Sequence, residues 1–311
     1  MKSKIWIALL ALYIVWGSTY LAIRFAVETI PPFLSAGLRF LVSGIILMAW
    51  RRAAGDEMPT RGQWKSLAII GALLLLGGNG LVSFAEQRIA SGVAALIVGT
   101  VPLWLALIEA VRPGGVKPTR GALAGLVIGF GGIYLLIGPS ELTGDLQLDA
   151  IGTIAVIIAA FLWSLGSIYS RGAELPKSAL MMTGGEMLAG SLPIFLVSFL
   201  VGEWRGFHFA QVSTESWLAL LYLIAFGSMI GFVSYIWLLQ NAPVSLVATY
   251  AYVNPLVAVF LGNWFAQEPL TARTLAAAGI IIGSVALINW ARQASAGREA
   301  EAKSVVPQEV E

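Results

Sequence analysis

Residues 5–24 read IWIALLALYIVWGSTYLAIR and carry no charged side chain before Arg24. A helix that crosses the hydrocarbon core of a bilayer needs about 20 predominantly apolar residues, so this stretch has the length and composition of one membrane span. It follows the short basic start MKSK directly, and no clear small-residue cleavage site comes after it. We therefore expect a first transmembrane helix that is retained, rather than a signal peptide that is removed.

Further apolar runs follow this first one along the chain. The protein of 311 residues is 58% hydrophobic and only 12% charged, whereas soluble domains carry about a quarter charged residues. The sequence therefore predicts an all-α integral membrane protein with ten transmembrane helices. The polar remainder, residues 291–311, has no apolar period, and we expect a disordered tail there. The other nine expected spans are 32–50, 66–85, 91–111, 119–138, 150–170, 178–201, 216–239, 245–265 and 271–290.

Lys and Arg are distributed unevenly between the two sides of the membrane that these spans define. Most of them lie in segments on the side of the N-terminus, and the connecting segments of the other side hold only Arg88, Arg205 and Arg273. Lys and Arg accumulate in the cytoplasmic loops of membrane proteins. We therefore expect both termini to lie in the cytoplasm.

The two halves of the chain match each other in register, and chance similarity among Leu-, Ala- and Gly-rich helices is the alternative reading. Residues 1–146 are expected to form a first five-helix repeat and residues 147–290 a second one. Because five is an odd number of spans, the second repeat must be inverted relative to the first, as in many alternating-access transporters. The matching positions include Trp16 and Trp163, Arg24 and Arg171, and Gly37 and Gly184 at an offset of 147, and Gly78 and Gly231, and Pro102 and Pro255 at an offset of 153.

Three strings carry a family resemblance: ALYIVWGSTYLAIRFAVETIPP at 11–32, SGVAALIVGTVPLW at 91–104 and TYAYVNPLVAVFLG at 249–262. In their order and spacing they are similar to the EamA family of the drug/metabolite transporter superfamily, and above all to its YedA-type branch. The resemblance covers almost everything from Ile5 to Trp290. It implies a ten-helix exporter of metabolites or drugs in the bacterial inner membrane, without a nucleotide cofactor.

Two charged side chains fall inside expected spans at matching repeat positions. Arg39 lies in the second span and Glu186 in the seventh. A charge at the centre of a spanning helix costs roughly 2.5–3.5 kcal/mol on insertion scales, so each must face protein or a water-filled cavity. We predict that Arg39 anchors an anionic group of a substrate, such as a carboxylate, and that Glu186 is an ion or proton coupler. The alternative is that both only bridge helices.

Aromatic and amide side chains inside the spans suit a cavity that holds an amphipathic solute; helix packing is the alternative for each of them. A proline inside a helix frees a backbone carbonyl, and we expect the matching pair Pro102 and Pro255 to form hinges next to a central site. The predicted substrate-binding residues, together with Arg39, are Trp16, Tyr20, Asn79, Trp163, Tyr250 and Asn254.

Composition excludes several other functions. The chain has no cysteine and a single histidine, so it offers no thiol chemistry and no metal cluster. It has no GxxxxGK[ST] string for ATP, and its net charge of +2 does not favour nucleic acid. We expect no cofactor, no catalytic residue and a secondary transporter that acts as a monomer and exports amino-acid-like or amphiphilic solutes. A homodimer, a passive channel or lipid flippase, and a membrane-embedded enzyme are the alternatives.

Overall fold

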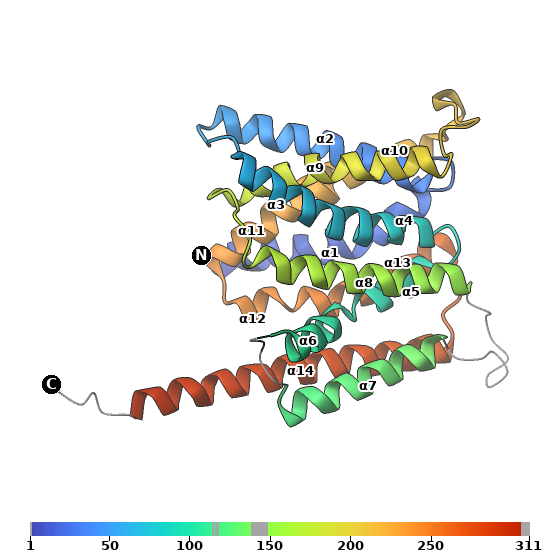
Figure 1. The fold of residues 1–311 in the computed structure, drawn as a ribbon. Coiled ribbons are helices and arrows are strands. Elements are labelled where there is room, and N and C mark those ends of the chain that lie inside the picture. Colours follow the sequence, from blue (N-terminus) through green and yellow to red (C-terminus); the bar gives the residue numbers. More distant parts are fainter. Residues whose placement is uncertain (1, 114, 116–117, 138–148, 306–311) are drawn as a thin grey trace.

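The computed structural model describes residues 2–113, 115, 118–137 and 149–305, and this part of the chain is helical, without strands (Figure 1). Helices suit lipid because they satisfy their backbone hydrogen bonds internally. The first half of the chain holds α1 (Lys2–Ala26), α2 (Pro32–Ala53), α3 (Arg61–Gly71), the π-helix η1 (Ala72–Gly80), α4 (Leu81–Ala85), α5 (Ser91–Val98), α6 (Val101–Val111) and α7 (Arg120–Ile137).

The second half of the chain is described from residue 149 onward. It holds α8 (Ala150–Ser170), α9 (Ala179–Leu200), the short η3 (Phe209–Gln211), α10 (Thr214–Tyr222), the π-helix η4 (Leu223–Ile230), α11 (Gly231–Asn241), α12 (Val244–Val247), α13 (Tyr250–Ala266) and α14 (Ala272–Val305). Helices lie over all ten expected spans. Among the described residues, eight helical segments are long and apolar enough to cross a membrane, and Arg120–Leu136 is a shorter apolar helix.

One boundary differs clearly from the sequence prediction. α14 continues to Val305, whereas the tenth span was expected to end at residue 290 and to lead into a disordered tail. The loss of the apolar period after residue 290 marks the end of the apolar stretch, and the structure shows that it does not mark the end of the helix. Residues 306–311 lie outside the described part of the chain.

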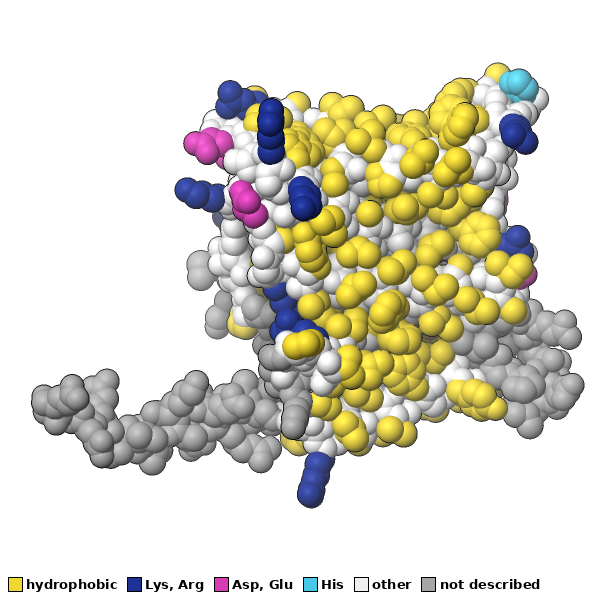
Figure 2. All heavy atoms as spheres, viewed as in Figure 1, with side chains coloured by type: hydrophobic (Ala, Val, Ile, Leu, Met, Phe, Trp, Pro, Cys, Tyr) yellow, Lys and Arg dark blue, Asp and Glu magenta, His cyan; other side chains and the backbone are white. Residues whose placement is uncertain are grey.

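The helices cross the molecule from one end to the other (Figure 1). The end where α1 begins, at the left of Figure 1, is called the N-terminal face, and the end with the α1–α2 turn is called the opposite face. Figure 2 shows hydrophobic side chains over the middle of the visible surface and most Lys and Arg side chains toward the two ends. The apolar middle suits the hydrocarbon core of a bilayer, because a soluble protein rarely exposes such a large apolar patch.

Glycines bring α2 and α9 into backbone contact. A Cβ atom at Gly44 would lie 2.7 Å from the backbone nitrogen of Leu188, and one at Gly184 would lie 3.1 Å from the backbone nitrogen of Met48. Small residues allow such close approach between membrane helices, where van der Waals packing replaces the hydrophobic effect as the driving force. The pair α2–α9 therefore joins the two halves of the chain along their length.

Two spans contain wider π turns at related positions. η1 includes Gly78, and η4 ends immediately before Gly231, the residue that matches Gly78 in the sequence repeat. Two other spans are interrupted, between α5 and α6 at residues 99–100 and between α12 and α13 at residues 248–249. π-bulges and helix breaks occur frequently at functional sites, and three of these four irregular segments, namely η1 and the two helix breaks, contribute residues to the lining of one cavity.

Candidate functional site

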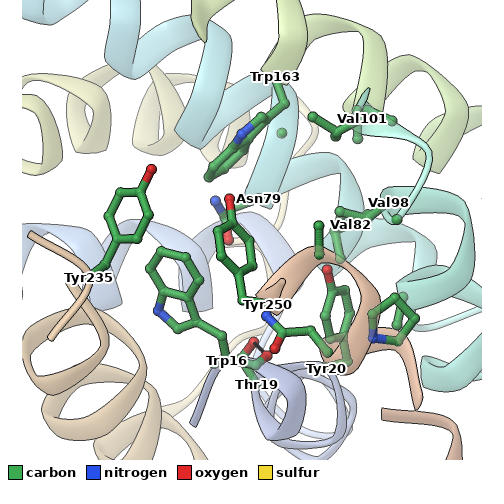
Figure 3. A pocket seen from close by; sticks show the side chains of 18 of the residues that line it. Trp16, Thr19, Tyr20, Asn79, Val82, Val98, Val101, Trp163, Tyr235 and Tyr250 are labelled. Atoms are coloured by element: carbon green, nitrogen blue, oxygen red, sulfur yellow. Dashed lines mark hydrogen bonds between the residues drawn. The ribbon is translucent and has the colours of Figure 1, made fainter. Parts of the chain in front are cut away.

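A cavity of about 320 Å³ lies between the two halves of the chain (Figure 3). Its walls come from α1, α2, η1, α4, α5, α6, α8, α11, α12, α13 and α14. The structure brings to this cavity all seven residues that the sequence predicts to bind substrate, and both predicted hinge prolines. The residues are Trp16, Tyr20, Arg39, Asn79, Trp163, Tyr250, Asn254, Pro102 and Pro255. Their roles in binding and movement stay predictions.

Trp16 forms part of an aromatic wall. Its ring centroid lies 5.3 Å from that of Phe232, 5.2 Å from that of Tyr235 and 5.3 Å from that of Tyr250. Its indole Nε1 donates a hydrogen bond of 3.2 Å to the carbonyl of Gly227. Edge-to-face aromatic pairs of this kind contribute about 0.5–1.5 kcal/mol beyond the area that they bury, so the wall is a fixed surface for a flat or apolar group.

The two tryptophans of the cavity pack reciprocally against glycines of the other half. A Cβ atom at Gly231 would lie 2.7 Å from Cδ1 of Trp16, and a Cβ atom at Gly78 would lie 2.7 Å from Cε3 of Trp163. Trp16 matches Trp163 and Gly78 matches Gly231 in the sequence repeat. Each half therefore contributes one indole to the cavity and one glycine that makes room for the indole of the other half.

Arg39 supplies a positive charge at the cavity wall, although it is only 6% exposed. Its Nε donates a 2.9 Å hydrogen bond to Oγ of Ser228, and its guanidinium lies 4.9 Å from the ring centroid of Phe40. The ion pairs recorded among the described residues do not include Arg39. Its terminal nitrogens are therefore suited to bind an anionic group from the cavity, because a guanidinium matches carboxylate geometry.

Asn254 supplies an acceptor at the same cavity. The side chain is 8% exposed, and its Oδ1 atom is buried without a hydrogen-bond partner. A buried polar atom in this condition costs roughly 1–3 kcal/mol, so a donor that reaches it from the cavity gains a favourable partner. Asn79, on η1, adds a second amide to the lining (Figure 3).

The two prolines lie beside the helix breaks in different ways. Pro102 occupies the first turn of α6, where the missing amide breaks no helical hydrogen bond, whereas Pro255 lies inside α13. The sequence predicts that each proline lies inside a spanning helix and frees a backbone carbonyl there, which holds for the position of Pro255 and is wrong for Pro102. A Cβ atom at Gly99, in the α5–α6 break, would lie 3.1 Å from Cγ of Pro255, so the irregular backbone of one half meets the proline of the other.

Glu186, the predicted coupler, is separated from the other predicted site residues. It is 8% exposed on α9, and it is not among the residues that line the cavity. Its backbone carbonyl lies against Gly71 of α3 instead. Repeat symmetry placed it at a depth that mirrors Arg39, but the side chains of mirrored positions need not face the same space. The coupling role of Glu186 stays a prediction.

Sequence reasoning missed part of the cavity wall. Phe232, Tyr235 and Leu239 line it from α11, at steps of three and four residues, which place them on one helix face. That spacing alone fits a lipid-facing or a cavity-facing stripe equally well. The position of Gly231 next to this stripe, matched to Gly78 in the repeat, is the signal that could have identified it.

Hydrogen bonds between the α1 end and the turn after α4 lie between the cavity and the opposite face. Nη1 of Arg24 donates a 2.6 Å hydrogen bond to the carbonyl of Glu86, and Nε2 of Gln87 donates one of 3.2 Å to the carbonyl of Val27. Ala85 and Glu86 are completely buried. We call this layer the seal; its residues are Arg24, Ala26, Val27, Ala85, Glu86 and Gln87.

Two glutamates hold helix ends near the opposite face. Oε1 and Oε2 of Glu268 accept hydrogen bonds of 2.7 and 3.0 Å from the first two amides of α5. Glu203 likewise accepts bonds of 3.1 and 2.8 Å from the amides of Phe33 and Leu34 in the first turn of α2. A carboxylate at a helix N-terminus satisfies amides that lack partners within the helix and complements the helix dipole.

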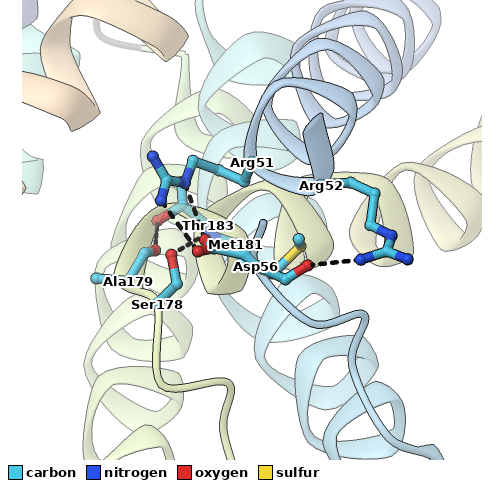
Figure 4. Close-up of polar contacts among 7 residues, drawn as sticks. All are labelled: Arg51, Arg52, Asp56, Ser178, Ala179, Met181 and Thr183. Atoms are coloured by element: carbon cyan, nitrogen blue, oxygen red, sulfur yellow. Dashed lines mark hydrogen bonds and ion pairs between the residues drawn. The ribbon is translucent and has the colours of Figure 1, made fainter. Parts of the chain in front are cut away.

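Other polar contacts lie at the N-terminal face. Glu109 bonds to Arg112 and to Arg171, each at 2.7 Å. Figure 4 shows Asp56, in the α2–α3 connection, between Arg51 and Ser178. Hydrogen bonds from the Arg51 guanidinium and then from the Ser178 hydroxyl lower the pKa of Asp56 below its ordinary value. These contacts tie the α2–α3 connection to the start of α9.

Comparisons with known proteins agree with this fold. A family model described as the EamA-like transporter family matches residues 3–138 and 150–290. The chain is 40% identical over 283 residues to the uncharacterized inner membrane transporter YedA of Escherichia coli (strain K12), with 90% of this chain and 89% of that protein covered.

More distant relatives extend this picture. The uncharacterized transporter YvbV of Bacillus subtilis (strain 168) is 24% identical, with 93% and 92% of the two chains covered. A solved crystal structure of a protein 22% identical superposes with a TM-score of 0.62 and covers 94% of this chain and 98% of its own, which shows a shared fold. The family match and the 40% identity place this chain in the EamA-like transporter family.

Proposed function

We propose that this protein is a secondary transporter that exports amino-acid-like or amphiphilic solutes by alternating access. Its two units are residues 1–146 and 147–290, arranged as inverted five-helix repeats around the cavity. The reciprocal packing of Trp16 on Gly231 and of Trp163 on Gly78 carries this proposal. Two similar units that contribute equivalent groups to one cavity can exchange conformations and so open it to each side in turn.

The cavity lining supports a zwitterionic or amphipathic substrate. Arg39 suits a carboxylate, the unpartnered Oδ1 of Asn254 suits an ammonium or amide donor, and the aromatic wall of Trp16 and Tyr235 suits an apolar side chain. Such a combination of an apolar pocket with a few convergent polar groups is typical of small-molecule sites. Pro102 and Pro255, at the interrupted helices, would act as hinges, and Glu186 remains a candidate for ion or proton coupling.

The polar seal supports a state in which the cavity is closed toward the opposite face. Leu239 lines the cavity from the last turn of α11, and α11 ends at the N-terminal face (Figure 1). We assign the N-terminal face to the cytoplasm, because Lys and Arg concentrate there. In this assignment the protein lies in the inner membrane with both termini inside, and the cavity takes up solute from the cytoplasm.

A ligand screen followed by transport tests the proposal. Ligand binding to the native state raises the midpoint of thermal unfolding, so the purified protein is screened against amino acids and amphiphiles. Each compound that stabilises the protein is then tested for counterflow in proteoliposomes. Binding without counterflow, for every compound that stabilises the protein, would contradict a transporter of these solutes.

Arg39 allows a sharper test of the substrate class. Removing one charge-assisted hydrogen bond costs roughly 1.5–3 kcal/mol, so Arg39→Gln is expected to weaken binding of an amino acid about 10- to 100-fold. The methyl ester of the same amino acid lacks the carboxylate and serves as the matched control, with equal affinity for both proteins. Equal weakening for acid and ester would contradict carboxylate binding by Arg39.

Alternating access has its own test, since the protein contains no cysteine. Ala248→Cys places a single thiol in the cavity lining. A membrane-impermeant maleimide is expected to reach this thiol from the N-terminal face in the described state and from the opposite face during turnover. Labelling from both faces at equal rates without substrate would indicate a continuous pore, as in the channel alternative.

A further inference from the structure

We propose that Glu86 is a proton-binding site within the seal, and that a proton bound there stabilises the state in which the cavity is closed toward the opposite face. This inference deepens the proposed transport function by giving it a coupling ion. It rests on the position of Glu86, on the condition of its carboxyl group and on the charged groups that face it.

Glu86 lies one helical turn beyond the cavity. Its amide donates a 2.9 Å hydrogen bond to the carbonyl of Val82, and Val82 lines the cavity. Its own carbonyl accepts the hydrogen bond from Arg24, the neighbour in sequence of the lining residue Ile23. Glu86 is therefore the acidic residue that separates the cavity from the opposite face.

The carboxyl group of Glu86 is buried and unpartnered. The residue is 0% exposed, and neither Oε1 nor Oε2 has a hydrogen-bond partner. A buried carboxylate without partners is strongly destabilised, and such a group takes up a proton instead of remaining charged. The neutral acid therefore fits the sealed state better than the carboxylate does.

The glutamates that hold helix ends or arginines differ from Glu86 in this respect, because their carboxylate oxygens have partners. Both oxygens of Glu268 bind amides of α5, those of Glu203 bind amides of α2, and those of Glu109 bind arginines. Glu186 is buried too, but it does not line the cavity. Its carboxyl group can also hold a proton, so the experiment has to separate it from Glu86.

The groups around Glu86 could hold its charge once the seal opens. Arg24 and Tyr20 face it from α1, Arg39 faces it from α2 across the cavity wall, and Glu268 faces it from the α13–α14 connection. The two guanidiniums favour the carboxylate, and the negative charge of Glu268 opposes it. Opening would admit water and free Arg24 from the Glu86 carbonyl, so proton release at Glu86 would accompany movement of the seal.

Infrared spectroscopy of the purified full-length protein in lipid tests this directly. A protonated carboxyl group gives a C=O stretching band that disappears when the proton leaves as the pH is raised. Glu186 can give a band of its own, so Glu186→Gln serves as the reference protein. Adding Glu86→Gln to it should remove a titrating band that Glu186→Gln alone keeps. An unchanged band in the double variant would overturn the proposal.

Two further measurements keep the result interpretable. Glu86→Asp retains a carboxyl group, so its band should persist but should disappear at a different pH. This variant replaces Glu86→Gln if the amide variant fails to fold. A band that disappears at the same pH as in the wild type would then count against the site. In proteoliposomes, counterflow by Glu86→Gln should lose its response to a pH gradient while exchange at equal pH continues. Because the band is measured without substrate, absence of transport in the wild type would contradict the proposed function and leave the proton site standing.

Discussion

Replacement of Gly231 by alanine tests the reciprocal packing of the two tryptophans. The added methyl group would overlap Nε1 of Trp16 and lie 2.7 Å from its Cδ1, whereas non-bonded carbon atoms pack at about 3.5–4.0 Å. The indole must therefore withdraw by more than about 1 Å. Tyr235 and Tyr250, with ring centroids 5.2 and 5.3 Å away, restrict this withdrawal, and the remaining direction leads into the cavity.

The expected cost of Gly231→Ala follows from this crowding. Overpacking of a well-packed interior costs about 1–3 kcal/mol. Alanine also favours a helix over glycine by up to about 1 kcal/mol, so a matched control is needed. Gly131→Ala, on α7, provides it, because a Cβ atom there meets no other atom within 4 Å. Relative to Gly131→Ala, we expect Gly231→Ala to unfold more easily by about 1–3 kcal/mol.

Equilibrium unfolding in mixed micelles gives the stability, and counterflow in proteoliposomes gives the transport rate. Gly231→Ala should transport more slowly than Gly131→Ala, because the displaced indole occupies part of the cavity. Gly78→Ala, which crowds Trp163 in the same way, should produce a similar loss. If Gly231→Ala and Gly131→Ala match each other in both measurements, the account of Trp16 is wrong.

Two more predictions concern contacts away from the cavity. Glu268→Ala leaves the first two amides of α5 without their acceptor and should lower the free energy of unfolding by about 0.5–2 kcal/mol, as loss of a helix cap does; an unchanged thermal midpoint would contradict this. The pKa of Asp56 is lowered by hydrogen bonds from Arg51 and Ser178. The stability that Asp56 contributes is therefore present above its ordinary pKa of 3.8, and it is lost as the pH falls through the lower pKa of the folded protein. Thermal unfolding across this range should show the loss in the wild type and not in Asp56→Asn, and parallel profiles would refute it.

The sequence predicted the helices well because lipid imposes a simple rule on them. Each span needs about 20 apolar residues, and the runs of such residues are separated by polar or proline-containing segments. The cavity residues could be predicted for a related reason. Polar and large aromatic side chains such as Arg39, Asn79 and Trp163 are costly to place in lipid, so they gather where protein or water replaces it.

The remaining features depend on tertiary contacts that a single sequence does not display. Glu86 lies at the end of a span, where an acidic side chain commonly faces water. Its burial accompanies contacts of the turn after α4 with Arg24 of α1 and with Gly152 of α8. The depth of Glu186 inside a span predicted a functional role, but Glu186 does not line the cavity. The continuation of α14 to Val305 could not be predicted from the apolar pattern, because charged residues sustain a helix as readily as apolar ones.

The close approach of α2 and α9 has a mechanical consequence. Where a glycine of one helix faces the main chain of another, as at Gly44 and Leu188, no long side chain is available to change rotamer and absorb a sliding motion. α2 and α9 should therefore move as one rigid pair, with a nearly constant separation in every state of the transport cycle. Movement would then be confined to the interrupted helices on either side of this pair. The distance between spin labels on α2 and α9 should stay constant, so it can serve as the reference for distances that change in the other helices.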